Sequence, residues 1–385
     1  MSLYWMIGFP VALLAVAVGG ALVALAGTDK VLGSTGTPEI PKAIEDPNAP
    51  GWTAVVEPTE TAMVAHTGSE GALTGVSVLI GDEDEAEGGS VLVIPADTQV
   101  TAPGLTDPIL LSALFEDQGV DGLAVGVGGL LGFGFTEGES VLDADAFEQL
   151  LNAVAPIEIT VVDPITTVDP SDSIVSGTHQ FDASELVSYF EVLGDGESPL
   201  NRTDRQRRLW VALLVELAND EAAVDSVVGS SEPFGELLGE LAAGPVNDLS
   251  LPVTPEFSDG EERPIYLIRA DDADQIASMS AAIVPLPTAP YPGARARLEL
   301  SDGAGDATAR DTAIPALTTA GAELVLLRNE LVFDQERSEV IYYDESFAQI
   351  AADMADAIGA AEPTLVASEG PLFDVEVTLG RDWEP

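Results

Sequence analysis

Cysteine is absent from this 385-residue chain, and basic residues are scarce. The absence of cysteine excludes disulfides, thiolate metal ligands and thiol nucleophiles. It does not indicate a compartment, because exported domains also fold without disulfides. Only 14 lysines and arginines stand against 66 acidic residues, which gives a net charge of −52. A surface of that sign repels phosphate backbones, so we expect no nucleic-acid partner.

The few basic residues are unevenly placed. Lys30 and Lys42 are the only lysines, and the first arginine is Arg202. A phosphate site in the first 200 residues would need backbone NH groups, a helix N-terminus or a metal ion. The acidity itself has two interpretations: adaptation to salt, or a dedicated acidic binding surface. A hydrophobic fraction of 46% and a mean hydropathy of +0.22 are enough to fill real cores, so the chain is not disordered overall.

An uncharged apolar run occupies residues 3–26. As a helix it would span roughly 36 Å, enough to cross a hydrocarbon core of ~30 Å. Tyr4 and Trp5 lie where interfacial aromatic residues are common. Residues 24–26 resemble a signal-peptide cleavage site, but the basic segment that precedes such peptides is missing. We therefore expect an uncleaved single-pass membrane anchor (1–28), a linker (29–60), and the bulk of the chain outside the cytoplasm.

Short β-branched runs at 76–80 and 90–94 predict two strands joined by an acidic turn. The turn lacks the spacing and the closing glutamate of a calcium loop, so a solvated hairpin tip is favoured. Helical patterns cover 109–118, 119–132 and 144–155, and residues 157–162 alternate as a strand. The glycines of 126–132 are not a nucleotide-binding loop, because no strand and downstream acidic residue flank them.

Four of the chain's arginines fall within residues 202–208, at the start of an amphipathic helix that extends to about 218. They either pair with nearby acids or bind an anion. The two histidines, His66 and His179, lack the spacing of a zinc site and have no nucleophile partner, so we expect surface or loop positions for both.

Several of these segments together resemble the LytR–CpsA–Psr (LCP) family of envelope proteins. Residues 92–98, L-V-I-P-A-D-T, are similar to a strand-end motif of that family. Residues 129–132, G-L-L-G, and the stretch 147–161 are similar to a second motif. Residues 194–195 and 201–206, N-R-T-D-R-Q, are similar to its arginine-bearing helix start, apart from a short insertion at 197–200. The order and spacing agree over about residues 65–250.

The tail carries a second, separate resemblance. Residues 297–305, 340–343 and 375–383 are strand-like, helical stretches end at Gly321 and Gly359, and the whole stretch predicts the order strand–helix–strand–strand–helix–strand. The opening and the ending, V-E-V-T-L-G-R-D-W, resemble a LytR C-terminal domain. The resemblance implies an α/β protein: an LCP-like domain with a central sheet flanked by helices (61–284), a proline-rich linker (285–293) and a small α/β C-terminal domain (294–385).

LCP proteins transfer a glycopolymer from a polyprenyl-pyrophosphate carrier to peptidoglycan. Arginines hold the pyrophosphate, and a divalent cation bound to an aspartate assists. The resemblance therefore implies Asp97, Arg202 and Arg205 as catalytic residues if the chain is active. It implies Arg202, Arg205 and Gln206 as ligand-binding residues, and Asp97 as a ligand of Mg²⁺. The expected partners are a polyprenyl phosphate or pyrophosphate lipid, or a cell-wall glycopolymer.

Several motif arginines of the family are missing here. Ala96 replaces the arginine next to Asp97, and residues 71–75 lack both charged residues of an earlier motif. In a third motif, Glu191 and Leu193 stand in place of two arginines. Loss of one transition-state charge donor typically costs about 2.7–4 kcal/mol. We therefore expect a degenerate relative, non-catalytic or weakly active; the alternative is an active glycopolymer phosphotransferase with a reduced arginine clamp.

The charge imbalance predicts that stability depends on salt. The Debye length falls from about 30 Å at 0.01 M to about 3 Å at 1 M, so salt should screen the mutual repulsion of the acids. The soluble part of the chain should melt several degrees higher in molar NaCl than in 0.01 M NaCl. Equal melting temperatures would show that the acids are well paired or well spaced.

Overall fold

The computed structural model describes residues 44–68, 70–82, 88–167, 173–229, 234–257, 264–368 and 370–383. The predicted anchor, residues 29–43 of the predicted linker and most of the acidic turn after residue 81 lie outside these ranges. Within the described ranges, no helix is both long enough and apolar enough to cross a membrane.

A five-stranded sheet forms the centre of the LCP-like part, in the order β10-β4-β3-β2-β7. The strands are β2 (Thr61–Thr67), β3 (Leu73–Gly81), β4 (Gly89–Pro95), β7 (Glu139–Leu142) and β10 (Val246–Ser250). The central strand β3 is antiparallel to both of its neighbours, β2 and β4, whereas β7 pairs parallel with β2 and β10 pairs parallel with β4 at the two edges. The middle strands are buried on both faces, which explains their continuous apolar sequences and confirms the strands predicted at 76–80 and 90–94.

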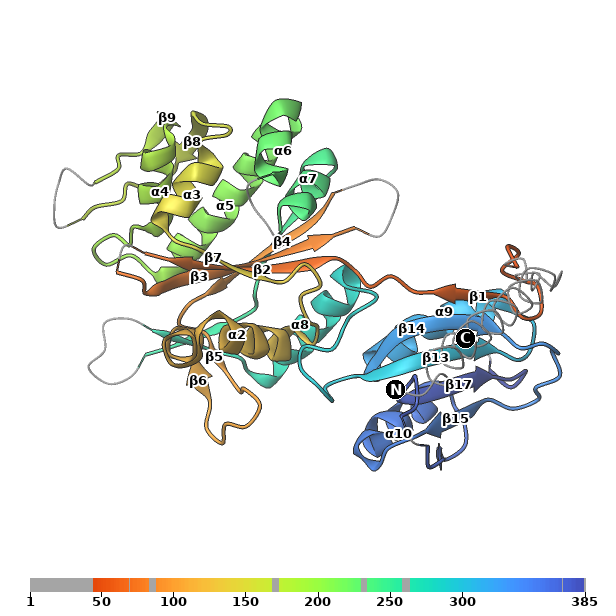
Figure 1. Cartoon of the computed structure of the whole chain (residues 1–385). Helices are drawn as coiled ribbons and strands as arrows, with labels where there is room; N and C mark the ends of the chain where they lie inside the picture. The colour runs from red at the N-terminus through yellow and green to blue at the C-terminus, as the bar shows by residue number, and fades with distance from the viewer. Residues whose placement is uncertain are drawn as a thin grey trace, which may run out of the picture. The chain divides into compact units, whose positions relative to one another are not determined.

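Helices cover both faces of this sheet (Figure 1). One face carries α3 (Ala144–Leu151), α4 (Ala183–Glu191), α5 (Pro199–Ala218), α6 (Glu221–Val228) and α7 (Gly235–Ala243); the other carries α2 (Leu111–Leu131) and α8 (Ala270–Ile283). Alternate residues of each strand serve the two cores: Val64 packs toward α3–α7, while Met63 and Ala65 pack toward α2 and α8. The two helices predicted at 109–118 and 119–132 form α2, and the break predicted between them is confirmed at Gly119, whose positive φ of 70° favours glycine.

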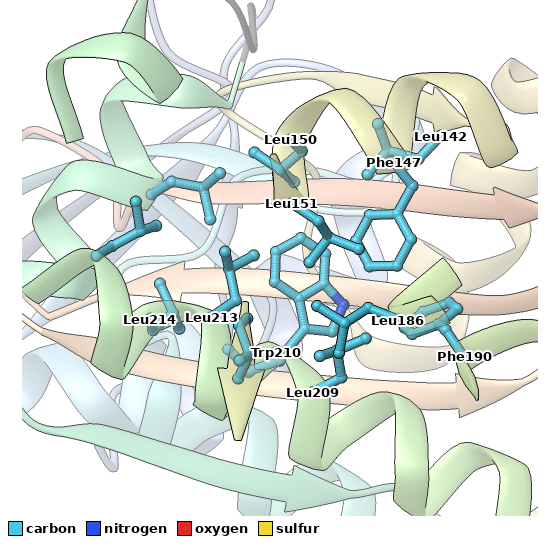
Figure 2. Close-up of a cluster of buried hydrophobic side chains, with 14 of the residues drawn as sticks. Leu142, Phe147, Leu150, Leu151, Leu186, Phe190, Leu209, Trp210, Leu213 and Leu214 are labelled. Atoms are coloured by element: carbon cyan, nitrogen blue, oxygen red, sulfur yellow. The ribbon is translucent and has the colours of Figure 1, made fainter. Parts of the chain in front are cut away.

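An aromatic cluster, made of the rings of Phe147, Phe190 and Trp210 among buried leucines, lies between the sheet and the helices α3, α4 and α5 (Figure 2). Trp210 of α5 is fully buried, and its Nε1 donates a hydrogen bond of 2.8 Å to Ser77 Oγ of β3. The His66 Nε2 lies 2.9 Å from the same oxygen, and the His66 ring lies 4.6 Å from that of Phe190. Burial lowers the pKa of His66 to about 3, so the imidazole is neutral and can accept the Ser77 hydroxyl proton.

The prediction that both histidines lie on the surface or in loops was wrong for His66. It is 2% exposed and belongs to β2, because a neutral imidazole with a hydroxyl partner packs well among aromatic rings. His179 lies in β9 (Gly177–Phe181), which pairs antiparallel with β8 (Ile157–Val161). The strand β8 confirms the alternation at 157–162, whereas its partner β9 was not predicted.

The C-terminal part is a six-stranded sheet in the order β1-β14-β13-β17-β15-β16. Its elements, in chain order, are β1 (Thr53–Val55), β13 (Ala296–Asp302), α9 (Ala307–Thr319), β14 (Ala322–Asn329), β15 (Glu339–Tyr342), η2 (Glu345–Phe347), α10 (Ala348–Ala357), β16 (Thr364–Leu365) and β17 (Val375–Leu379). This order follows the predicted alternation of strands and helices with two additions. The short β16 was not predicted, and β1 comes from a segment that precedes the LCP-like domain.

Shorter elements complete the LCP-like part: β5 (Gln99–Val100) pairs with β6 (Ile109–Leu110), and β11 (Thr254–Glu256) with β12 (Ile265–Leu267). The first half of the proline-rich linker 285–293 is hydrogen-bonded to the LCP-like domain at Leu286 and Thr288. Thr59 N donates to Leu286 O (3.0 Å), Leu286 N donates to Thr59 Oγ1 (3.2 Å), and Gly134 N donates to Thr288 O (3.0 Å). The two ends of the LCP-like domain therefore meet at Thr59 and Leu286.

Glu60, just before β2, predicts a pH-dependent stability. Burial, a hydrogen bond to Glu240 of α7, and the charges of Glu240, Glu236 and Glu57 raise the pKa of Glu60 to about 7. The folded state thus holds a proton that the unfolded chain releases near pH 4.5. As pH rises from 5 to 8, the wild type should lose thermal stability relative to Glu60→Gln. The variant Glu362→Gln, at an exposed position, should follow the wild type; identical curves for wild type and Glu60→Gln would contradict the prediction.

Candidate functional site

The helix α5 presents its arginines on different sides. Ser198 caps the helix by accepting a hydrogen bond from Leu200 N (3.3 Å), and Pro199 occupies its first position. Arg205 and Gln206 lie on the buried face of the helix, one turn before Trp210. The carboxylate of Asp204, on the outer side, pairs with Arg207 and Arg208.

Arg205 is engaged by groups of the chain itself. Its Nε donates to Tyr189 O (3.2 Å), its Nη2 donates to Val192 O, and its Nη1 forms an ion pair with Glu197. The guanidinium also lies 5.6 Å from the centre of the Tyr189 ring. The Arg205 side chain is 9% exposed, so these contacts give it a structural role that ties the end of α4 to α5. Glu197 belongs to the short insertion that precedes the arginines.

Arg202 interacts electrostatically with a carboxylate, that of Glu191. Glu191 ends α4 and is half-buried, and burial raises the pKa of its carboxyl group, while the positive charge of Arg202 lowers it. Glu191, which stands in place of an arginine of the family motif, therefore acts on Arg202 through its negative charge. Since Glu197 pairs with Arg205, a glutamate acts on each of the two remaining motif arginines.

Asp97 lies directly after β4. Its Oδ1 accepts a hydrogen bond from Ser112 Oγ (3.4 Å), and its backbone oxygen accepts one from Tyr266 N (3.0 Å). Tyr266 is fully buried, and burial raises the pKa of its hydroxyl. The negative charge of Asp97 acts in the same direction, whereas Ser198 and Arg202 lower the pKa. Asp97 and Arg202 therefore both lie close enough to Tyr266 to act on its hydroxyl.

Gln206 is fully buried against the backbone of β3. Its Nε2 donates to Phe190 O (3.4 Å). A Cβ atom placed on Gly75 would come within 2.6 Å of Gln206 Oε1, so glycine at position 75 lets this side chain approach. Gln206 thus packs inside the domain, next to the aromatic cluster.

A groove of about 920 Å³ opens between the β2–β3 turn, the β8–β9 hairpin and α4. Glu70, Glu185 and Glu191 are its carboxylates, and Val175 and Phe181 are among its apolar walls. Among the described residues that line it there is neither lysine nor arginine, and none of them is a predicted site residue. A second cavity, of about 570 Å³, lies on the other side of the turn and is lined by Ser112, the hydrogen-bond partner of Asp97.

The predicted Mg²⁺ ligand stays a prediction. Among the described residues, no group of three or more histidine, aspartate or glutamate side chains is placed to hold a metal ion. Asp97 could contribute one carboxylate, and Mg²⁺ commonly takes its remaining ligands from water and substrate phosphates. Such a site would form only with a phosphate ligand present.

Sequence reasoning identified Asp97, Arg202 and Glu191 as residues of one region, but it missed Tyr266 and Glu197. Tyr266 comes from β12, more than 160 residues after Asp97, and no local pattern marks it. Glu197 had a weak signal, because an acid in an inserted segment before buried arginines is a candidate counterion.

No protein-family model and no curated protein matches the chain. Its structural neighbours are LCP proteins. Bacillus subtilis TagV is 17% identical, with a TM-score of 0.49 over 59% of this chain and 98% of that chain. A structure of YwtF (TagT) with bound octaprenyl pyrophosphate lipid is 14% identical, with a TM-score of 0.44 over 60% and 91%. A LytR–CpsA–Psr enzyme from Actinomyces oris is 14% identical, with a TM-score of 0.46 over 60% and 93%. At these values the activity of the chain has to be inferred from its own side chains.

The Arg205–Glu197 pair predicts a large stability effect for a charge-neutral substitution. Glu197→Gln leaves the buried guanidinium without its counterion and should lower the free energy of unfolding by about 2–3 kcal/mol. Asp204→Asn, which breaks the more exposed pairs with Arg207 and Arg208, should cost less than about 1 kcal/mol. Urea denaturation of both variants measures this, and equal effects would show that the Arg205–Glu197 pair is not special.

Proposed function

We propose that the chain is a membrane-anchored, extracytoplasmic envelope protein of the LCP type, and that its LCP-like domain binds a ligand but does not transfer glycopolymers. The observation that supports this proposal is the ion pair between Arg205 and Glu197, together with the charge of Glu191 acting on Arg202. The apolar run at residues 3–26 supports the anchor.

Pyrophosphate transfer needs uncompensated positive charge around the leaving group. In this region the two positive charges of Arg202 and Arg205 are outnumbered by three carboxylates, those of Asp97, Glu191 and Glu197. A unit charge 4 Å away contributes about 4 kcal/mol at an effective dielectric constant of 20, so Glu197 offsets much of the attraction that Arg205 would offer a phosphate. The negative charge of Glu191 acts in the same direction on Arg202. The buried position of Arg205 adds a second obstacle, because its donors already serve Tyr189, Val192 and Glu197.

The ligand of such a domain is a polyprenyl phosphate lipid or a wall glycopolymer held weakly. Arg202 is the cation placed to receive its phosphate, at the N-terminal turn of α5, where backbone NH groups add partial positive charge. Nucleic acid is excluded as a partner by the net charge of −52.

A second candidate function is an active glycopolymer phosphotransferase with a reduced clamp. The charges of Asp97 and Arg202, which both act on the Tyr266 hydroxyl, favour it, because a carboxylate and a cation then lie in one region. In that case Asp97 would hold Mg²⁺ with the phosphates of the substrate, and the metal would supply the positive charge that the missing arginines lack.

Titration of a polyprenyl phosphate into residues 44–385, with and without Mg²⁺, together with a transfer assay from a polyprenyl-pyrophosphate donor, tests the proposal. The wild type should bind weakly and show no transfer. Arg202→Ala should reduce binding at least tenfold, which is about 1.4 kcal/mol. Arg208→Ala, on the same helix but half-exposed beside Asp204, is the matched control and should bind like the wild type.

Transfer by the wild type that disappears in Asp97→Asn would establish the second candidate function instead. Binding that is tight and unchanged in Arg202→Ala would place the ligand elsewhere on the domain.

A further inference from the structure

Residues 47–56, called the clasp below, come before the LCP-like domain in the sequence but belong to the sheet of the C-terminal domain. Strand β1 within the clasp pairs antiparallel with the edge strand β14, with Thr53 opposite Arg328 and Val55 opposite Leu326. The clasp and β13–β17 therefore form one sheet, and residues 57–284 are inserted between its two pieces.

Backbone hydrogen bonds extend the pairing beyond β1 at both ends. Gly51 N donates to Glu330 O (3.2 Å), Asn329 N donates to Trp52 O (2.8 Å), and Val56 N donates to Val325 O (3.0 Å). An added strand of this kind gains affinity from its main-chain hydrogen bonds and specificity from its side chains.

Two buried polar side chains of the C-terminal domain are directed at the clasp. Arg310 of α9 is 3% exposed, and its guanidinium lies 4.7 Å from the centre of the Trp52 ring. Its Nη1 donates to Asn329 Oδ1 (2.8 Å), which orients the amide. Asn329 Nδ2 in turn donates to the backbone oxygens of Pro47 and Ala49, each at 2.9 Å.

These contacts make the clasp the natural partner of both groups. A desolvated cation over a tryptophan face is attracted to the ring. A buried amide left without acceptors is costly, so Asn329 depends on the clasp for its Nδ2 partners. The edge of the domain thus offers three things to a bound segment: the edge strand β14 itself, Arg310 for an aromatic ring, and the Asn329 amide for two backbone carbonyl groups.

The clasp sequence is suited to binding in one conformation. Pro47 and Pro50 restrict the backbone before it binds, which lowers the entropy that ordering costs. Gly51 adopts a φ of 77°, a left-handed conformation that turns the chain into the strand at Trp52.

We propose that the β14 edge, with Arg310 and Asn329, is a strand-binding site whose ligand is the chain's own residues 47–56. This inference goes beyond the proposed function and does not depend on it. The site fastens the N-terminal segment of the chain to the C-terminal domain. The clasp precedes β2 in the chain, and the hydrogen bonds between Thr59 and Leu286 join the two ends of the LCP-like domain just after it.

Cleavage of the full chain tests whether the clasp binds without its covalent link. A protease site inserted between Glu57 and Pro58, both exposed, allows the chain to be cut after folding in detergent, with an affinity tag at the N-terminus. Residues 58–385 should stay on the affinity resin with the tagged piece after cutting. A synthetic peptide of residues 45–57 should release them, and the same peptide with Trp52→Ala should be at least tenfold less effective.

Two substitutions in the tagged chain distinguish the contact of the Trp52 ring with Arg310 from the backbone pairing of β1 with β14. Trp52→Ala should let most of the cut body wash off, whereas Val55→Ala, at a position 76% exposed, should retain it like the wild type. The proposal would be overturned if residues 58–385 of the cut wild type washed off the resin while their thermal unfolding matched that of the uncut chain. Equal retention with Trp52→Ala would overturn it too, because the Arg310 contact would then contribute nothing.

Discussion

The buried hydroxyl of Ser77 joins three elements at the centre of the LCP-like domain, and the placement of the site depends on it. It accepts the indole proton of Trp210 and lies within hydrogen-bond distance of His66, so α5 is bonded to β3 and β2 inside an aromatic core. This fixes the rotation of α5 about its own axis. Residues four or five positions before Trp210 then face inward, which is why Arg205 and Gln206 are buried.

A buried arginine needs compensation, and this chain supplies it internally. Glu197 and two carbonyls at the end of α4 satisfy Arg205, and Glu191 at the end of the same helix acts on Arg202. The positive charge that could hold a pyrophosphate is thus offset before any ligand arrives. Asp97 and Arg202 still share the neighbourhood of Tyr266, so a weak anion site is compatible with the geometry and a strong clamp is not.

Local patterns predicted the parts of the fold that local chemistry determines. The apolar runs at 76–80 and 90–94 gave strands because both faces of the sheet are covered, and Gly119 marks the break in α2 because of its positive φ. Long-range partners were missed. The pairing of β1 with β14, the position of Tyr266 beside Asp97 and the burial of His66 all depend on segments distant in sequence, and no spacing rule reports them.

A crystal structure of residues 44–385 soaked with inorganic pyrophosphate and Mg²⁺ tests the central claim most directly. If the arginines are compensated internally, Arg205 keeps its ion pair with Glu197, and any pyrophosphate contacts Arg202 alone at partial occupancy. A fully occupied pyrophosphate that bridges Arg202 and Arg205, with Glu197 turned away and Mg²⁺ on Asp97, would contradict the account and establish a working clamp.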